Sequence, residues 1–72
     1  MDKEELGARI ASVRTLRKMK QADLACRIGT STQTVSNWET GQRVPRADML
    51  RELCVALHCT SDYLLGLSDT IV

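Results

Sequence analysis

Uncharged amides and hydroxyls gather on one side of the segment from residue 32 to residue 40. At 100° per residue, a helix over this segment places Val35 and Trp38 together on one side. The opposite side holds Gln33, Ser36, Asn37 and Thr40. Surface helices usually carry Glu and Lys outside, whereas amides and hydroxyls can hydrogen-bond base edges in a DNA major groove. The segment is therefore a candidate base-reading helix, and a merely solvated polar helix is the alternative.

Basic residues surround this segment, although the whole chain is nearly neutral. The 72 residues include ten Lys plus Arg and nine Asp plus Glu, which gives a net charge of +1. Residues 14–46 hold seven basic and two acidic residues, whereas residues 52–72 hold three acidic residues and no Lys or Arg. Such an asymmetry is typical of a surface that faces DNA phosphates.

The sequence gives little support for a metal site or an enzyme active site. Cys54 and His58 are four residues apart, with Cys59 adjacent and Cys26 elsewhere, so together they could hold a structural zinc. The usual zinc spacings are absent and core packing explains the thiols, so we expect no metal and no cofactor. The chain has one histidine and no nucleophile elbow, P-loop or HExxH motif. We therefore expect no enzyme.

Stop and start signals divide the chain into five short helices. Apolar residues recur at spacings of three and four, and no strand-length stretch alternates. Gly29, Gly41 and Gly66 stand where helices end, and hydroxyl residues follow at 30–32 and 60–61 as possible caps. We predict an all-α fold with helices over residues 3–18, 21–28, 32–40, 46–57 and 61–65. The second and third helices form a helix-turn-helix by spacing.

Length and hydropathy limit the setting of the protein. Seventy-two residues suffice for one small domain, residues 1–72. No apolar stretch reaches the roughly 20 residues of a membrane helix, and the start lacks the features of a signal peptide. Three cysteines form no disulfide framework. We expect a cytoplasmic protein with no membrane partner.

A series of short motifs runs through the chain in a fixed order. They are Leu6-Gly7, Gln21–Ala25, Ile28-Gly29, Val35–Glu39, Gly41, Pro45 and Asp62–Gly66. In this order they resemble the lambda repressor-like helix-turn-helix family of Cro and phage repressors, also called the XRE family. The resemblance covers residues 6–66 and implies a compact domain of five helices whose third helix enters the major groove.

The resemblance also implies roles for individual residues. Thr32, Gln33, Ser36 and Asn37 match positions that touch bases. Phosphate contacts fall to Gln21, Ser31, Thr40, Arg43 and Arg46. Arg14 and Glu39 match a partly buried ion pair between the first and third helices.

Five residues depart from the family pattern, among them Cys54 and Cys59, which stand where the family usually has Ala and Val. Lys18 and His58 stand where the family often has glycine, so the alternatives there are a strained left-handed backbone and a different turn. Leu16 stands where a charged residue is common, and we interpret it as a lone exposed apolar side chain, with part of a partner surface as the alternative.

We expect a homodimer on an inverted-repeat operator, because one short helix with about four base-reaching side chains cannot select a genomic site alone. Apolar residues near the C-terminus would form the contact between subunits: Tyr63, Leu65, Leu67 and Ile71. The alternative is that these side chains complete the core and a frayed tail.

The sequence therefore predicts a regulator that binds double-stranded DNA at specific sites, most simply a repressor acting by operator occupancy. We see no sign of a small-molecule ligand. The alternative class on the same fold is a protein-interaction adaptor. Within the DNA-binding class, a phage repressor, an antitoxin-type module and a restriction-modification controller all remain open.

Overall fold

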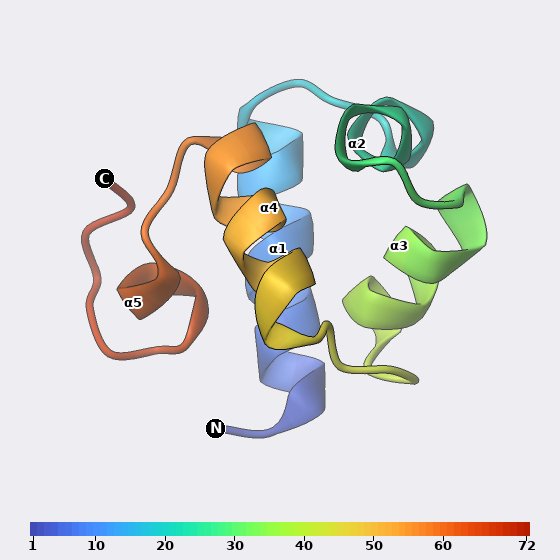
Figure 1. Ribbon diagram of the computed structural model, residues 1–72. Coiled ribbons are helices and arrows are strands. Elements are labelled where there is room, and N and C mark those ends of the chain that lie inside the picture. Colours follow the sequence, from blue (N-terminus) through green and yellow to red (C-terminus); the bar gives the residue numbers. More distant parts are fainter.

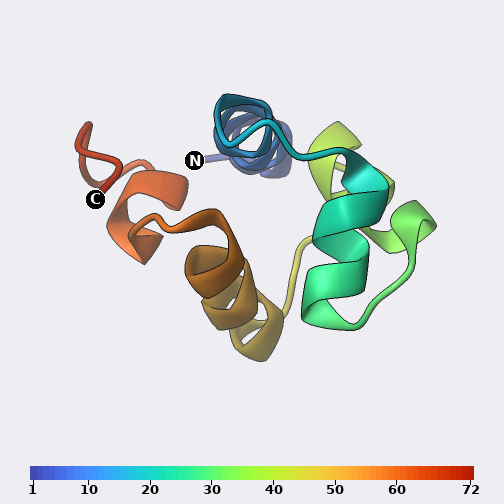
Figure 2. The same ribbon diagram turned by 90° about the horizontal axis from the view of Figure 1, so that it is seen from above.

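The computed structural model describes all 72 residues and contains five helices and no strand. The helices are α1 (Lys3–Leu16), α2 (Gln21–Ile28), α3 (Thr32–Thr40), α4 (Ala47–Leu57) and α5 (Ser61–Leu64). In Figure 1, α1 and α4 occupy the middle, with α2 and α3 on one side and α5 on the other. The view from above has the same order (Figure 2). The predicted all-α fold of five helices is confirmed.

Ten buried apolar side chains hold the five helices together. The fully buried ones are Ile10, Val13, Leu24, Val35, Leu53, Leu57 and Leu64, and Leu6, Ala25 and Trp38 complete the cluster. Full burial of one such aliphatic side chain contributes about 1.5–3 kcal/mol. Helix α1 packs against both α3 and α5, so it joins the two sides of the molecule. None of the helices has the length and apolar content needed to cross a membrane.

Two non-glycine residues just past helix ends have left-handed backbones. The φ angle is 59° at Lys18, two residues past the end of α1, and 52° at His58, the C-cap of α4. Helix α1 ends at Leu16, two residues before the predicted end, and the Lys18 N–H donates to the carbonyl of Thr15 at 2.9 Å. Of the two alternatives, the strained left-handed backbone is the one observed at both positions, and such a conformation costs about 1–2 kcal/mol per residue.

Two other predicted boundaries were one residue too wide. Arg46 is the N-cap of α4 and has an extended backbone, so the helix starts at Ala47. Leu65 is the C-cap of α5, so that helix ends at Leu64. Leu16 is 56% exposed, as predicted.

Helices α1 and α3 approach closely at Gly7. A Cβ atom built there would lie 2.3 Å from the carbonyl oxygen of Trp38 and 2.6 Å from that of Glu39. Both obstacles are backbone atoms, which cannot turn aside. Gly7 is therefore required for the observed position of α3 against α1.

Candidate nucleic-acid interface

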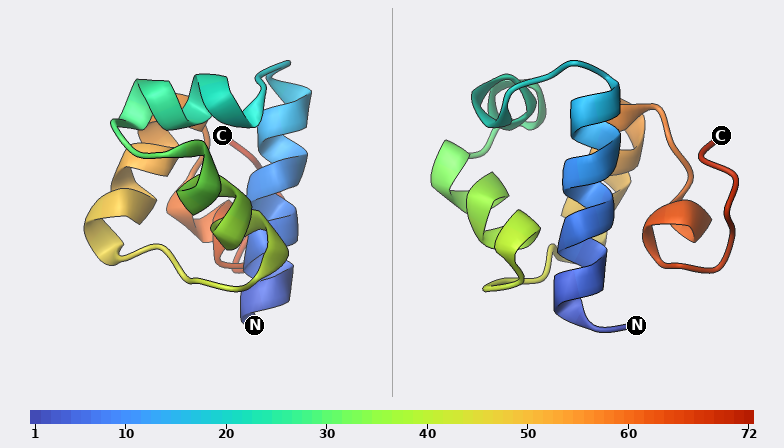
Figure 3. Two further views of the ribbon diagram at one scale, coloured as in Figure 1. Left: turned by 90° about the vertical axis from the view of Figure 1, so that its right-hand side faces the viewer. Right: turned by 180° about the vertical axis from the view of Figure 1, so that it is seen from behind.

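The turn between α2 and α3 is built by a glycine and a serine. Gly29 has a left-handed backbone with φ of 76°, and the N–H of Thr30 donates to the carbonyl of Ala25 at 2.9 Å. Ser31 then caps α3, because its Oγ accepts from the N–H of Thr34 at 3.0 Å. These contacts fix the angle at which α3 leaves α2, and α3 lies on the outside of the molecule with α2 crossing above it (Figure 3, left).

Helix α3 has an apolar inner side and a polar outer side. Val35 is fully buried and Trp38 is 4% exposed. Of the four residues expected to touch bases, Gln33, Ser36 and Asn37 lie on the other side, and Thr32 lies at the edge between the two sides. Thr32 and Gln33 are exposed, and Ser36 and Asn37 are half-buried, so all four remain accessible. We call these four residues the α3 face (Thr32, Gln33, Ser36 and Asn37).

Hydrogen bonds already order part of this surface. Gln33 Nε2 donates to Oδ1 of Asn37 at 2.9 Å, so the two amides are linked one turn apart. Thr40 Oγ1 donates to the carbonyl of Ser36 at 3.0 Å, which leaves the hydroxyl oxygen able to accept.

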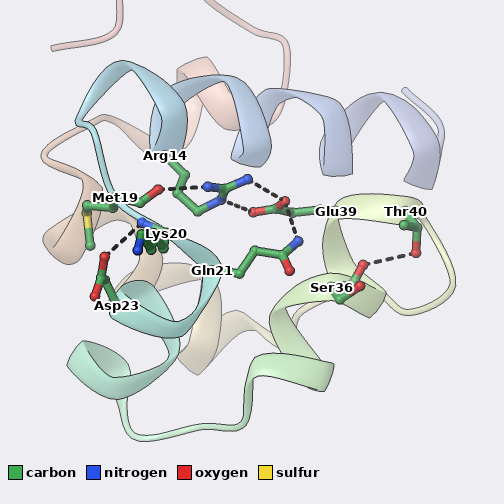
Figure 4. Close-up of polar contacts among 8 residues, drawn as sticks. All are labelled: Arg14, Met19, Lys20, Gln21, Asp23, Ser36, Glu39 and Thr40. Carbon is green, nitrogen blue, oxygen red and sulfur yellow. Dashed lines mark hydrogen bonds and ion pairs between the residues drawn. The ribbon is translucent and has the colours of Figure 1, made fainter.

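An ion pair ties α3 to α1 (Figure 4). Arg14 donates through Nε to Oε2 of Glu39 at 2.6 Å and through Nη2 to Oε1 at 3.1 Å. The two side chains are only 17% and 6% exposed. Arg14 also donates to the carbonyl of Met19 at 2.7 Å. Its hydrogen bond to Glu39 raises the pKa of Arg14, and desolvation opposes that rise. The structure brings Arg14 and Glu39 together where the sequence placed them.

Gln21 joins this cluster instead of pointing freely outward. Its Nε2 donates to Oε1 of Glu39 at 2.9 Å (Figure 4). One amide donor is therefore engaged inside the protein. The second N–H of the Gln21 amide and the first-turn N–H groups of α2, which have no partner within the helix, are the groups left for an anion at this end.

Arg17 has a structural role that sequence reasoning missed. Its Nε donates to the carbonyl of Leu57 at 2.8 Å and its Nη2 to that of His58 at 2.7 Å. The guanidinium thus holds the last carbonyls of α4, so Arg17 does not belong to the free basic surface suggested by the charge pattern. The bond spans 40 residues, and no local signal in the sequence announces it.

The loop after α3 carries two exposed arginines. Arg43 forms no ion pair, and Arg46 lies 3.4 Å from the Asp48 carboxylate with both side chains mostly exposed. Lys18, Lys20 and Arg27 are also exposed.

A hollow of about 400 Å³ separates this loop from α3. Its lining includes Thr34, Asn37, Trp38, Arg43 and Arg46. The basic loop residues and the α3 face therefore border the same depression.

The four apolar residues expected to join two subunits divide into two pairs. Tyr63 is half-buried, and the Arg9 guanidinium lies 5.0 Å from its ring centre. Ile71 packs against the core, and its carbonyl accepts from the N–H of Thr60 at 2.8 Å. Leu65 and Leu67 are 38% and 75% exposed. Leu67 is thus open to a partner, Leu65 is partly open, and Tyr63 and Ile71 are largely engaged within the chain.

The thiols lie apart from the α3 face. Cys54 and Cys59 are half-buried and Cys26 is exposed. Burial, and then the neighbouring Cys54, raises the pKa of Cys59 to about 11. No group of three His, Cys, Asp or Glu side chains comes together as a metal site.

The chain belongs to a helix-turn-helix family. The family HTH_3, described as helix-turn-helix, matches residues 10–64. The match includes both helices of the motif and the core helices that support them. The resemblance to the repressor-like, XRE-type family is therefore confirmed.

Two relatives are phage repressors. The 26 kDa repressor protein of Escherichia phage HK022 is 38% identical over 50 residues, which cover 69% of this chain and 21% of that protein. Repressor protein C2 of Salmonella phage P22 is 38% identical over 74 residues, which cover 100% of this chain and 34% of that protein. This chain thus spans about a third of the length of that repressor. The solution structure of the DNA-binding domain of the P22 c2 repressor matches with a TM-score of 0.83 and 38% identity, over 97% of this chain and 95% of the domain. The crystal structure of the P22 c2 repressor in complex with a synthetic operator matches with a TM-score of 0.82 and 36% identity, over 88% and 96%.

Proposed function

We propose that this chain binds specific sites on double-stranded DNA and represses transcription by occupying an operator, with α3 in the major groove. The α3 face carries the proposal, because its outward groups are amides and hydroxyls, which can pair with base edges. The similarity to the P22 c2 repressor, whose crystal structure is a complex with a synthetic operator, supports the same interpretation.

Phosphate contacts would surround the bases. We assign them to Gln21, Ser31, Thr40, Arg43 and Arg46. Because the Gln21 amide is bonded to Glu39, we expect its phosphate contact to come mainly from the first-turn N–H groups of α2. Arg43 and Arg46 have exposed side chains that can reach a backbone strand.

We propose that two copies bind an inverted repeat. The exposed Leu65 and Leu67 are the best candidates for the contact between subunits, with Tyr63 and Ile71 behind them. Two heads related by a two-fold axis would place their α3 helices about 34 Å apart, so the half-sites should be spaced by roughly one helical turn. The contact is small, so we expect dimerisation to be weak without DNA.

The proposal gives the protein no enzymatic activity and places it in the cytoplasm, with the DNA it would bind. Phage repressor, antitoxin-type module and restriction-modification controller are the possible settings within this class. A protein-interaction adaptor is the alternative class, and it would show no salt-dependent binding to DNA.

Gel shifts over a salt series, on a duplex selected from a random pool and on random DNA, test this function. Gln33→Ala should cost about 1–3 kcal/mol on the selected duplex and little on random DNA. Arg43→Ala should weaken both alike and reduce the salt slope by about one unit. If no salt-dependent binding to DNA is found, the protein-interaction adaptor becomes the favoured function. If sedimentation shows one chain per palindromic duplex, the proposed dimer is wrong.

A further inference from the structure

Gln33 and Asn37 are joined by the side-chain hydrogen bond that orders the α3 face. Gln33 Nε2 donates to Asn37 Oδ1 at 2.9 Å. Gln33 is exposed, whereas Asn37 is half-buried and borders the hollow beside α3. Asn37, the less exposed residue, therefore holds the side chain of Gln33, the more exposed one.

The backbone at Asn37 is itself held in place. Its carbonyl accepts from the N–H of Gln42 at 2.9 Å and from that of Arg43 at 3.1 Å. These bonds anchor the end of α3 to the following loop and do not involve the Asn37 side chain. A change of that side chain therefore leaves them intact.

The bond leaves Gln33 with a defined set of free groups. A side-chain amide has two N–H donors and one carbonyl oxygen. One donor of Gln33 is used on Asn37, so its Oε1 and its second N–H are free. In the major groove adenine offers an N6 donor beside an N7 acceptor, which require one acceptor and one donor side by side.

We infer that Asn37 positions Gln33, and that the two side chains read a single adenine–thymine pair as one unit. Gln33 touches the adenine, and Asn37 is a positioning residue that holds its amide in the binding orientation. Because the long Gln33 side chain is already ordered, less rotamer freedom is lost when it meets DNA. This inference rests on the proposed function and makes two of its base-reading residues interdependent.

Selection from a pool of randomised duplexes tests the inference. The wild-type protein is compared with Gln33→Ala, Asn37→Ala and Asn37→Asp, and base frequencies are counted by sequencing. Gln33→Ala should abolish the adenine preference at one base pair in each half-site. Asn37→Ala should reduce the preference at that same base pair by about tenfold. Asn37→Asp keeps an oxygen that can accept from Gln33, so it should retain most of the preference even if total binding falls.

Ser12→Ala is the control, because Ser12 is exposed on α1 and belongs neither to the α3 face nor to the assigned phosphate contacts. Its loss should leave the adenine preference at the Gln33 base pair unchanged. The double variant of residues 33 and 37 should be no worse at that pair than Gln33→Ala alone, because Asn37 acts through Gln33. Circular dichroism melts of each variant verify that it is folded.

The outcomes separate the inference from the function beneath it. An adenine preference within about twofold of wild type in Asn37→Ala, or an equal loss in Asn37→Ala and Asn37→Asp, overturns the inference and leaves the proposed function standing. If Gln33→Ala instead loses the preference for a base other than adenine, the inference is also overturned and the proposed function stands. A wild-type protein that enriches no sequence overturns the proposed function, and the inference falls with it.

Discussion

Helix α1 holds the two sides of the molecule with one arginine each, and the two arginines are placed differently. Arg14 meets Glu39 of α3 through two hydrogen bonds, and these side chains are 17% and 6% exposed. Arg9 meets α5 through the carbonyl of Tyr63 at 3.0 Å and lies 3.5 Å from Glu5, with side chains 25% and 50% exposed. The carboxylate that pairs with Arg14 is enclosed by protein, whereas the Glu5 carboxylate, which pairs with Arg9 within α1, is half exposed.

The difference indicates which of the two attachments contributes more to the stability of the fold. A buried charge that loses its partner is costly, because water cannot replace the partner. An exposed charge that loses its partner is solvated at little cost. The attachment of α3 to α1 through Arg14 and Glu39 is therefore costlier to break than the Arg9 contacts on the α5 side. Under the proposed function, this attachment would hold the α3 face in a fixed position against DNA.

Removing either member of the buried pair should have the largest effect. We expect Arg14→Ala and Glu39→Ala each to lower the free energy of unfolding by about 3–5 kcal/mol, because the remaining charge is stranded. Thermal melts of both single variants and the double variant provide the measurement. Small and additive losses would mean that the pair contributes nothing to the attachment of α3.

Gly7→Ala should come next. The added methyl group would meet the carbonyls of Trp38 and Glu39, so α3 must shift away from α1. We expect a loss of about 3 kcal/mol, the upper part of the range for overpacking. Ala8→Gly, at an exposed position of the same helix, is the control for helix propensity and should cost about 1 kcal/mol. If Gly7→Ala has the same melting temperature as the wild type, the close approach of α1 and α3 at this residue is contradicted.

Arg9→Ala should have a smaller effect than either change on the α3 side. The variant loses one hydrogen bond, the contact with the Tyr63 ring and a partly exposed ion pair. We expect a loss of about 1 kcal/mol in urea unfolding. A loss as large as that of Arg14→Ala would remove the contrast between the two sides.

The cysteines on the two sides of the molecule differ in exposure, in the opposite sense to the two arginines, and should differ in reactivity. Cys26 is exposed on α2, whereas the pKa of Cys59 is raised by burial to about 11. At pH 8 a thiol with that pKa is almost entirely protonated, and Cys59 is half-buried whereas Cys26 is exposed, so iodoacetamide should modify Cys26 before Cys59. Mass spectrometry of peptides from the folded protein gives the order.

Cys59 also makes stability depend on alkaline pH. Its thiol ionises more readily in the unfolded chain, so its stabilising contribution is complete below pH 9 and is lost as pH rises towards 11. Cys59→Val should remove that part of the pH dependence. An unchanged alkaline profile in this variant would assign the loss to other groups.

Much of the fold could be predicted because its signals are local. Glycines at 29 and 41, the hydroxyl cap at Ser31 and the spacing of apolar residues gave α2 and α3 their observed bounds. The left-handed Lys18 and His58 were visible as departures from a pattern, but the length of α1 was overestimated because a lysine gives no stop signal.

The amino-acid sequence by itself determined which residues of α3 face outward, since helical periodicity and the burial of Val35 and Trp38 leave no other arrangement. Only the tertiary structure decided which hydrogen-bond partners the long polar side chains take. Arg17 closes the end of α4, and Gln21 turns to Glu39. A flexible side chain with several donors takes whichever partner the packed helices bring within reach, and that partner lies 18 residues away for Gln21 and 40 for Arg17.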